Sequence, residues 1–165
     1  MGMINGKSLH FDMDYNQKAK DILARIQYAT LATVTPDGKP WNSPVAHEID
    51  EAYVIYWFSD KENQHSKNVR VNPHVFIVIY DSTAPEGEGE GVYIEADVEE
   101  LDSADEINKI RSVKKGRVVD DANEFLGDAI RRCYKATPKR MWMNDSEEKD
   151  GKFIRDYRVE LDLLK

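Results

Sequence analysis

A short run of β-branched and aromatic residues at positions 53–58 leads directly into a polar segment that ends at Asn72-Pro73. The run predicts a buried strand. The polar segment predicts a helix, because Ser59 can cap its start, Glu62 follows three residues later as the second arm of a capping box, and Pro73 ends it. The chain is therefore expected to pass straight from a strand into a helix.

The first turn of that helix is rich in hydrogen-bond donors, namely Ser59, Lys61, Asn63, Gln64 and His65. Free backbone N–H groups at a helix start, together with hydroxyl, amide and cationic side chains, are what a phosphate group needs. Lys67 and Arg70 add positive charge here, although the whole chain has a net charge of −8. The pattern predicts either a phosphate site or an ordinary capped surface helix, and spacing alone does not separate the two.

Length and charge limit the class of protein. The 165 residues, of which 41% are hydrophobic and 33% charged, predict a single globular domain over residues 1–165, with residues 1–16 as a loose lead-in. The acidic balance argues against nucleic acid as a partner. No apolar run approaches the roughly 20 residues that cross a bilayer. Residues 1–14 lack the apolar core of a signal peptide, so we expect a cytoplasmic protein without a membrane partner.

Cysteine and histidine usage excludes several chemistries. Cys133 is the only cysteine, which excludes an internal disulfide and a multi-cysteine metal site. The four histidines are scattered and form no His-Glu-x-x-His motif, so we expect no metal site. No Gly-x-Ser-x-Gly motif occurs, and Cys133 falls on the apolar face of an expected helix, where a buried and inert thiol is the usual meaning.

Short strands separated by turn signals dominate the rest of the chain. Residues 74–80 are continuously apolar, which predicts a strand covered on both faces, whereas residues 92–101 alternate, which predicts one buried face. Ser103 with Glu106 signals a helix start. The other expected elements are strands at 28–34, 40–49, 52–58, 140–143 and 153–163, helices at 17–26 and 123–135, and loops or turns at 36–39, 82–91 and 145–151. Together they predict a mainly β fold, a small antiparallel barrel with peripheral helices.

Residues 38–73 resemble the N-terminal region of the pyridoxamine 5′-phosphate oxidase family without a gap. The shared features are Gly38-Lys39-Pro40, the strand through Pro44-Val45, the stretch Trp57-Phe58-Ser59-Asp60, and the helix that closes with Asn72-Pro73. The resemblance implies an FMN-binding split β-barrel that forms a homodimer with the flavin at the subunit interface. It also implies a flavin-dependent oxidoreductase that acts on a small molecule, which the sequence does not identify.

The resemblance places one strand along the flavin, through the residues Ser43, Pro44, Val45 and Ala46. Much of this contact comes from backbone groups, which any residue can supply. The family often has arginine at the position of Ser43 and lysine at that of Glu48, and both cations are absent here. Since a carboxylate repels a phosphate, we expect Glu48 to face solvent or to pair with a cation.

The resemblance assigns the flavin phosphate to the start of the helix. The residues expected around it are Phe58, Ser59, Asn63, Gln64, His65 and Lys67. The first two match the family's aromatic-threonine pair, and residues 63–65 fall where the family has serine, arginine and lysine. A phosphate would push His65 toward its protonated form. The alternative is that His65 packs on the helix surface.

Two further flavin contacts come from the C-terminal part of the chain. Residues 138–142 resemble the family's C-terminal strand, where a tryptophan and an arginine reach the isoalloxazine edge, and the candidates here are Trp142 and Lys152. The tryptophan register is off by two positions, so Asn144 competes with Trp142. Trp142 has the alternative role of filling the core.

Other functions stay open beside a flavin oxidoreductase. The family's oxidases use an arginine-x-histidine pair near the C-terminus, but residues 148–152 contain neither residue type, so pyridoxine 5′-phosphate oxidation ranks lower. A non-enzymatic flavin-binding or storage module is the alternative from another class, and the deazaflavin F420 is the alternative cofactor. The glycine-rich stretch at 87–91 lacks the lysine of a phosphate loop and carries two carboxylates, so it predicts a flexible loop.

Overall fold

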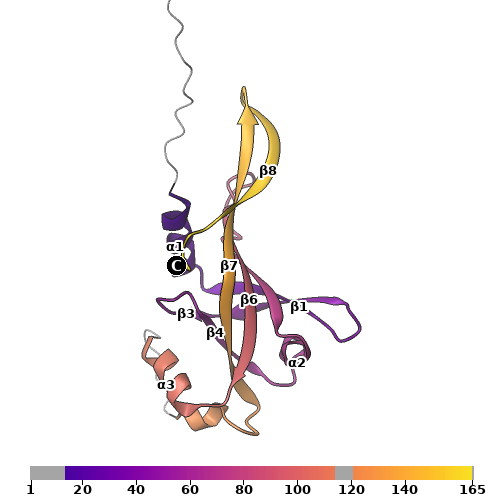
Figure 1. Cartoon of the computed structure of the whole chain (residues 1–165), viewed down its shortest axis with the longest axis vertical. Helices are drawn as coiled ribbons and strands as arrows, with labels where there is room; N and C mark the ends of the chain where they lie inside the picture. The colour runs from indigo at the N-terminus through magenta and orange to yellow at the C-terminus, as the bar shows by residue number, and fades with distance from the viewer. Residues whose placement is uncertain (1–13, 114–120, 165) are drawn as a thin grey trace, which may run out of the picture.

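The computed structural model describes residues 14–113 and 121–164, and its strands form one eight-stranded antiparallel sheet (Figure 1). The strands are β1 (Tyr28–Val34), β2 (Pro40–Ala46), β3 (Glu48–Ile49), β4 (Ile55–Asp60), β5 (His74–Tyr80), β6 (Gly91–Leu101), β7 (Arg131–Lys149) and β8 (Lys152–Glu160). The helices are α1 (Tyr15–Arg25), α2 (Gln64–Val71), α3 (Ala104–Val113) and the 3₁₀ helix η1 (Ala122–Phe125). Within these residues no helix is long and apolar enough to span a membrane.

The sheet curls without closing. Its order is β2-β1-β5-β6-β7-β4-β3, with β8 paired to β7, and the two end strands β2 and β3 do not pair with each other. Every strand pairing is antiparallel. The mainly β, open-barrel fold that the sequence predicts is therefore confirmed.

Alternation along the strands gives the sheet an inner and an outer face. Residues that pair directly across strands share a face, and the row Leu31, Ile77, Ile94 and Met141 is fully buried on the inner one. Helix α1 contacts β5 and β6, while α2 contacts β1, β2 and β6. A second apolar cluster joins α3 and η1 to β7, and it includes the buried Cys133.

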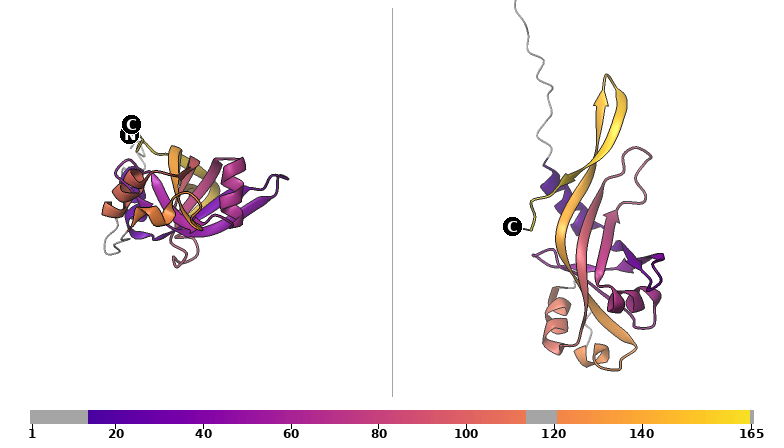
Figure 2. Two further views of the ribbon diagram at one scale, coloured as in Figure 1. Left: turned by 90° about the horizontal axis from the view of Figure 1, so that it is seen from below. Right: turned by 45° about the vertical axis from the view of Figure 1, so that its right-hand side comes forward.

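One end of the sheet extends into an arm, which we define as residues 144–158 of β7 and β8. β7 is 19 residues long, and its far half leaves the body of the protein together with β8 (Figures 1 and 2). From Lys152 to Arg158 every β8 residue is exposed, including Phe153 at 61% and Ile154 at 51%. At its base the arm is held to α1 through Asp145, which accepts hydrogen bonds from Tyr15 and Tyr157.

The start of the second helix differs from the expectation. β4 continues to Asp60, which pairs with Arg131 of β7, and α2 begins only at Gln64. Asn63 is its N-cap and makes no side-chain capping bond, so the capping box of Ser59 and Glu62 is wrong. The added strand pairing to β7 outcompetes the local capping signal.

The helix expected at 123–135 is also wrong. Only η1 is helical there, and from Arg131 onward the chain is strand, paired with β4 on one side and β6 on the other. Cys133 therefore lies on a strand, although it is buried as expected. Burial raises the pKa of its thiol to about 12, which keeps it unreactive.

Other strand predictions hold to different degrees. The boundaries of β1 and the alternation of β6 are confirmed. The short strand at 140–143 is part of the much longer β7, and the turn expected at 145–151 is reduced to Asp150-Gly151 between β7 and β8. β5 is not covered on both faces: Val75, Ile77 and Ile79 are buried, whereas Tyr80 on the other face is 47% exposed. Residues 1–13 of the expected lead-in lie outside the described residues, and α1 already begins at Tyr15.

Candidate functional site

A partly buried polar cluster lies where α2 meets the inner face of the sheet. His65, on the first turn of α2, is only 6% exposed. Its Nε2 atom is 2.8 Å from Ser59 Oγ on β4, and its Nδ1 atom is 3.2 Å from Ser43 Oγ on β2. Asn63 Nδ2 donates to Ser59 Oγ at 3.1 Å. The fold thus brings together Ser59, Asn63 and His65, which the sequence assigns to a flavin phosphate, and Ser43, which it assigns to the strand along the flavin. We call these four residues the His65 cluster.

The strand register places Ser43 in this cluster. Ser43 pairs with the buried Leu31 across β1 and β2, so its side chain shares the inner face. His65 therefore does not pack on the helix surface, which was the alternative expectation. It connects α2 to two strands that come from separate parts of the chain.

A second set of hydrogen bonds holds α2 in place beneath the cluster. Gln64 Nε2 donates to Asn68 Oδ1 at 2.8 Å, and the fully buried Asn68 donates to Thr33 Oγ1 at 2.9 Å. Ser66 Oγ donates to the carbonyl of Asp60 at 2.8 Å. Thr33, Ser66 and Asn68 are not among the site residues predicted from the sequence. The i, i+4 spacing of Gln64 and Asn68 is the one local signal that could have found part of this set.

The basic residues near α2 each have a partner within the chain. Lys67 pairs with Glu62 at 3.2 Å, and Arg70 pairs with Glu100 at 2.9 Å. Lys61 Nζ donates to the carbonyl of Asp128 at 2.8 Å. Two of the three cations that the sequence indicates are therefore paired with carboxylates, and the third donates to a neutral carbonyl. The donors left to an anion are hydroxyl, amide and imidazole groups and the N-terminal N–H groups of α2, whose dipole favours negative charge.

This donor set fits the phosphate of a flavin mononucleotide, which requires hydrogen-bond donors at one compact point. Burial lowers the pKa of His65, so the imidazole is neutral at pH 7 in the protein alone. A phosphate placed beside it would favour its charged form, since an opposite charge raises the pKa of a histidine. His65 is thus the residue of the cluster whose charge would respond to the anion.

The residues expected along the flavin divide between the two faces of β2. Ser43 and Val45 point inward, and Val45 is part of the core at 8% exposure. Pro44 and Ala46 are exposed on the outer face. Among the residues that the structure describes, β2 pairs only with β1, so it is an edge strand whose other edge can present backbone groups to a ligand.

Trp142 lies on the outer face, in the same row as Pro44. The row runs across the sheet through the paired residues Pro44, Thr30, Val78, Tyr93 and Trp142. The indole is half-buried and stacks on Phe76, with ring centroids 6.2 Å apart. The alternative that Trp142 fills the core is therefore wrong. Asn144, its competitor, instead holds the preceding loop: it accepts from Gly91 N at 2.8 Å and donates to Gly89 O at 2.9 Å.

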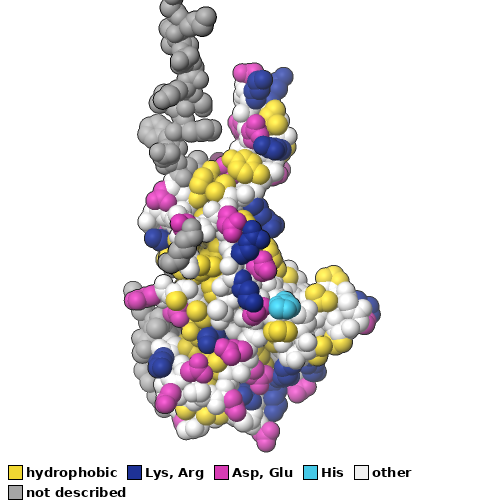
Figure 3. Space-filling view, viewed as in Figure 1, with side chains coloured by type: hydrophobic (Ala, Val, Ile, Leu, Met, Phe, Trp, Pro, Cys, Tyr) yellow, Lys and Arg dark blue, Asp and Glu magenta, His cyan; other side chains and the backbone are white. Residues whose placement is uncertain are grey.

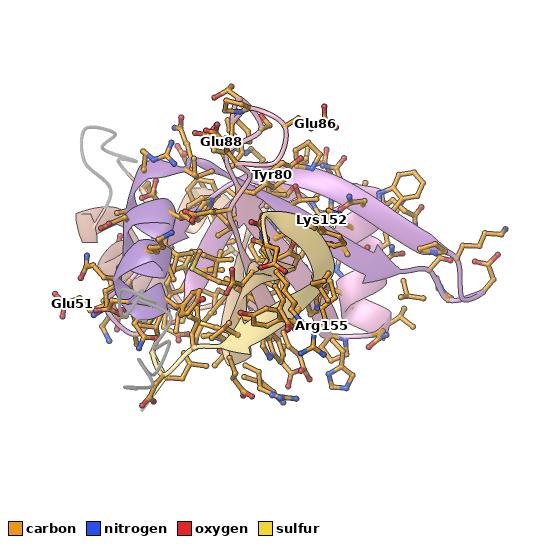
Figure 4. The ribbon with its side chains drawn as sticks, turned by 90° about the horizontal axis from the view of Figure 1, so that it is seen from above. Glu51, Tyr80, Glu86, Glu88, Lys152 and Arg155 are labelled. Atoms are coloured by element: carbon orange, nitrogen blue, oxygen red, sulfur yellow. The ribbon has the colours of Figure 1, made fainter. Side chains whose placement is uncertain are left out.

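Phe58 and Lys152 are not brought to the cluster. Phe58 turns toward the second apolar cluster and packs on Phe125, with ring centroids 4.5 Å apart. Lys152 lies at the tip of the arm opposite Lys149 (Figure 4). Glu48, expected to face solvent or pair with a cation, is half-buried and lines a hollow of about 210 Å³ that Lys109 also lines.

The buried histidines predict a pH-dependent stability. Burial lowers the pKa of both His47 and His65 in the folded protein, while the unfolded chain has the ordinary value of about 6.5. Below that value the unfolded state binds more protons, so the free energy of unfolding should fall as the pH drops from 7.5 to 5.5. Urea unfolding at several pH values measures it. A His47→Gln, His65→Gln double variant should lose less stability over this range, and an equal loss would contradict the assignment.

Comparison with solved structures supports the same fold. A heme binding protein from Mycobacterium smegmatis superposes with a TM-score of 0.66 at 19% identity, covering 90% of this chain and 59% of its own. HutZ, the heme storage protein from Vibrio cholerae, gives 0.65 at 17%, covering 78% and 94%. An F420 reductase gives 0.53 at 22%, covering 74% and 94%. This chain thus spans only 59% of the length of the Mycobacterium protein, and no curated protein matches its sequence significantly.

The open antiparallel sheet, with α2 set against its inner face, defines a split barrel of the kind found in these structures. Residues 15–145 match the family described as pyridoxamine 5′-phosphate oxidase. The chain belongs to that family, as the sequence resemblance predicts.

Proposed function

We propose that the protein binds FMN and acts as a flavin-dependent oxidoreductase on a small molecule. The observation that carries this proposal is the His65 cluster, in which Ser43, Ser59, Asn63 and His65 converge from two strands and the start of α2. A compact donor set suits one terminal phosphate, and no dinucleotide-binding glycine fingerprint is present in the sequence.

The outer face offers a place for the ring system. The free edge of β2 would supply backbone donors and acceptors. Trp142 lies four strands away from β2 on the outer face, so it would reach the ring only across the interface with a second copy of the chain. The flavin, when bound, supplies the hydride or electron transfer, and the protein supplies position and electrostatics. Because Lys67 and Arg70 pair with carboxylates of the same chain, the affinity for FMN would come mainly from the neutral donors of the His65 cluster.

Isothermal titration with FMN and FAD tests the proposal. We expect FMN to bind and FAD to bind more weakly, because the cluster offers one compact donor set rather than a site for a pyrophosphate and an adenosine. A Ser59→Ala variant should weaken FMN binding, whereas Trp41→Ala, on the β1–β2 hairpin, should not. Equal or tighter FAD binding, or no heat with either flavin, would refute the proposal. The mass and absorption bands of any chromophore released from the purified protein separate FMN from F420.

We further propose that the protein is a homodimer whose interface includes the outer face. Large apolar side chains are exposed there, including Tyr28 at 60% and Tyr80 at 47%, beside the half-buried Phe76, Val78 and Trp142. Contiguous exposed apolar surface of this kind marks an interaction site. Light scattering at micromolar concentration should give twice the chain mass of 19.0 kDa. A mass equal to that of one chain would contradict the proposed homodimer.

A non-enzymatic flavin-binding module is the second candidate, and one observation favours it. Lys67 and Arg70 are already paired within the fold, so the cluster lacks a free cation for the phosphate. Rapid mixing of the reduced, flavin-loaded protein with quinones and nitroaromatic compounds discriminates between the two. Oxidation faster than that of free reduced FMN supports the oxidoreductase, and oxidation at the same rate supports the module.

A further inference from the structure

Arg158 on β8 is held against aromatic rings on the outer face. Its guanidinium carbon is 4.2 Å from the ring centre of Tyr93 and 5.4 Å from that of Phe76, distances typical of cation–π contacts. The neighbouring arginines have acidic partners: Arg140 pairs with Glu160, and Arg155 pairs with Glu147. Arg158 contacts no carboxylate among residues 14–113 and 121–164.

A hollow of about 230 Å³ includes Tyr93, the ring under this guanidinium, among its walls, although Arg158 itself does not line it. Its walls are Val78, Tyr80, Gly89, Glu90, Gly91, Tyr93 and Asn144. Tyr93 belongs both to the hollow and to the rings under Arg158, and Asn144 pairs with Arg158 across β7 and β8. The carboxylate of the hollow, Glu90, already forms an ion pair with Lys18. The hollow thus has mainly apolar walls, and the Arg158 cation contacts one of them, the Tyr93 ring.

The Arg158 guanidinium is placed so that it can pair with an anionic group of a ligand. The chain has a net charge of −8, and on the visible face Lys and Arg side chains lie among Asp and Glu side chains and hydrophobic ones (Figure 3). The flat faces of a stacked guanidinium are covered, but its N–H edge stays free for the two oxygens of a carboxylate or phosphate. The stacking also fixes the side chain beforehand, which reduces the entropy lost when an anion binds.

We infer that this hollow binds a planar aromatic anion, with its ring against Val78, Tyr80 and Tyr93 and its anionic group on Arg158. The volume is below the ~300–1,000 Å³ of drug-sized pockets, so it suits a ring system of one or two rings. A purely apolar ligand would leave the guanidinium without a partner, and a cationic one would be repelled. The inference rests on the proposed function, because this ligand would be the small molecule that meets the flavin, and the hollow would lie at the edge of the proposed dimer interface, to which Val78 and Tyr80 also belong.

Titration of the flavin-free protein with 2-naphthoate tests the inference, with the neutral 2-naphthalenemethanol as the matched ligand. We expect naphthoate to bind at least about tenfold more tightly than the alcohol, because only the acid can pair with Arg158. Arg158→Gln should abolish that preference. The control is Arg155→Gln, because Arg155 lies on the other side of the arm from Tyr80 and pairs with Glu147 (Figure 4); this variant should keep the preference.

Three results would overturn the inference. They are equal binding of the two ligands or no binding of naphthoate, the same loss in both arginine variants, and conversion of a dimer to monomers by Arg158→Gln. The last outcome would show that Arg158 pairs with a carboxylate of a second copy. FMN titration of the parent protein keeps the two proposals separate, since a parent that binds FMN but not naphthoate refutes only this inference.

Discussion

Replacing His65 with alanine is expected to weaken FMN binding by about 1.5–3 kcal/mol, the usual worth of a hydrogen bond to a charged group. His65 connects Ser43 and Ser59, so the substitution removes both the imidazole donor and the contact that orients the two hydroxyls. Isothermal titration of the parent and the variant gives the difference directly.

The same pair of proteins should differ in the pH dependence of binding. Burial lowers the pKa of His65 in the free protein, and a bound phosphate raises it. Binding therefore takes up a proton between these two pKa values, so FMN affinity should rise as the pH falls through the bound-state pKa and level off below the free-state pKa. His65→Ala should remove this dependence between pH 8.5 and 5.5.

The matched control is His74→Ala. His74 is exposed and contacts Asp97 at 2.6 Å, away from the cluster, so its removal should leave FMN affinity and its pH profile unchanged. Circular dichroism must show that His65→Ala is folded at the titration temperature, because the substitution deprives two hydroxyls of a partner. If the folded variant titrates like the parent, the helix start and the neutral donors hold the phosphate, and His65 has no part in it.

The largest expected loss of stability comes from Trp57→Ala. Trp57 is 1% exposed and stacks on Tyr134, with ring centroids 5.5 Å apart. Large-to-small changes of a buried tryptophan cost about 3–5 kcal/mol, because contacts are lost and a cavity remains. The free energy of unfolding in urea, followed by far-UV circular dichroism, measures the loss.

Two further variants serve as comparisons for the stability loss of Trp57→Ala. Trp57→Phe keeps an aromatic ring in place and removes an indole N–H that finds no acceptor in the described part of the chain, so it should cost much less. Trp41→Ala removes a side chain that is 46% exposed and should have little effect. Equal losses for Trp57→Ala and Trp41→Ala would contradict the assigned core.

The sequence correctly predicted elements such as β1, for which the alternation and the bounding turn lie within a few residues of each other. β1 is bounded by a turn at Gly38, which adopts a positive φ of 83°, and its alternation was legible from the residues alone. The helical spacing at 123–135 was equally legible but misleading. There Cys133 pairs with Phe58 and Leu101, and ladders on both sides of β7 outweigh the local periodicity.

The sequence predicted which residues belong to the candidate site but not how they contact one another. The resemblance named His65, Ser59 and Ser43, yet the contact of His65 with Ser43 spans 22 residues and depends on the register of β2. The contact of Arg158 with Tyr93 depends on how far β7 and β8 extend together, which no local pattern records. Long-range register is thus the information that single-residue reasoning lacked.

The arm has a consequence for how this protein behaves at high concentration. β8 pairs only with β7, so the outer side of β8 is a strand edge whose backbone groups could template pairing with another molecule. Phe153 and Ile154 would favour such stacking, but Lys152, Arg155 and Asp156 surround them with charge of both signs. These flanking charges act as gatekeepers that keep an apolar edge from growing into an aggregate.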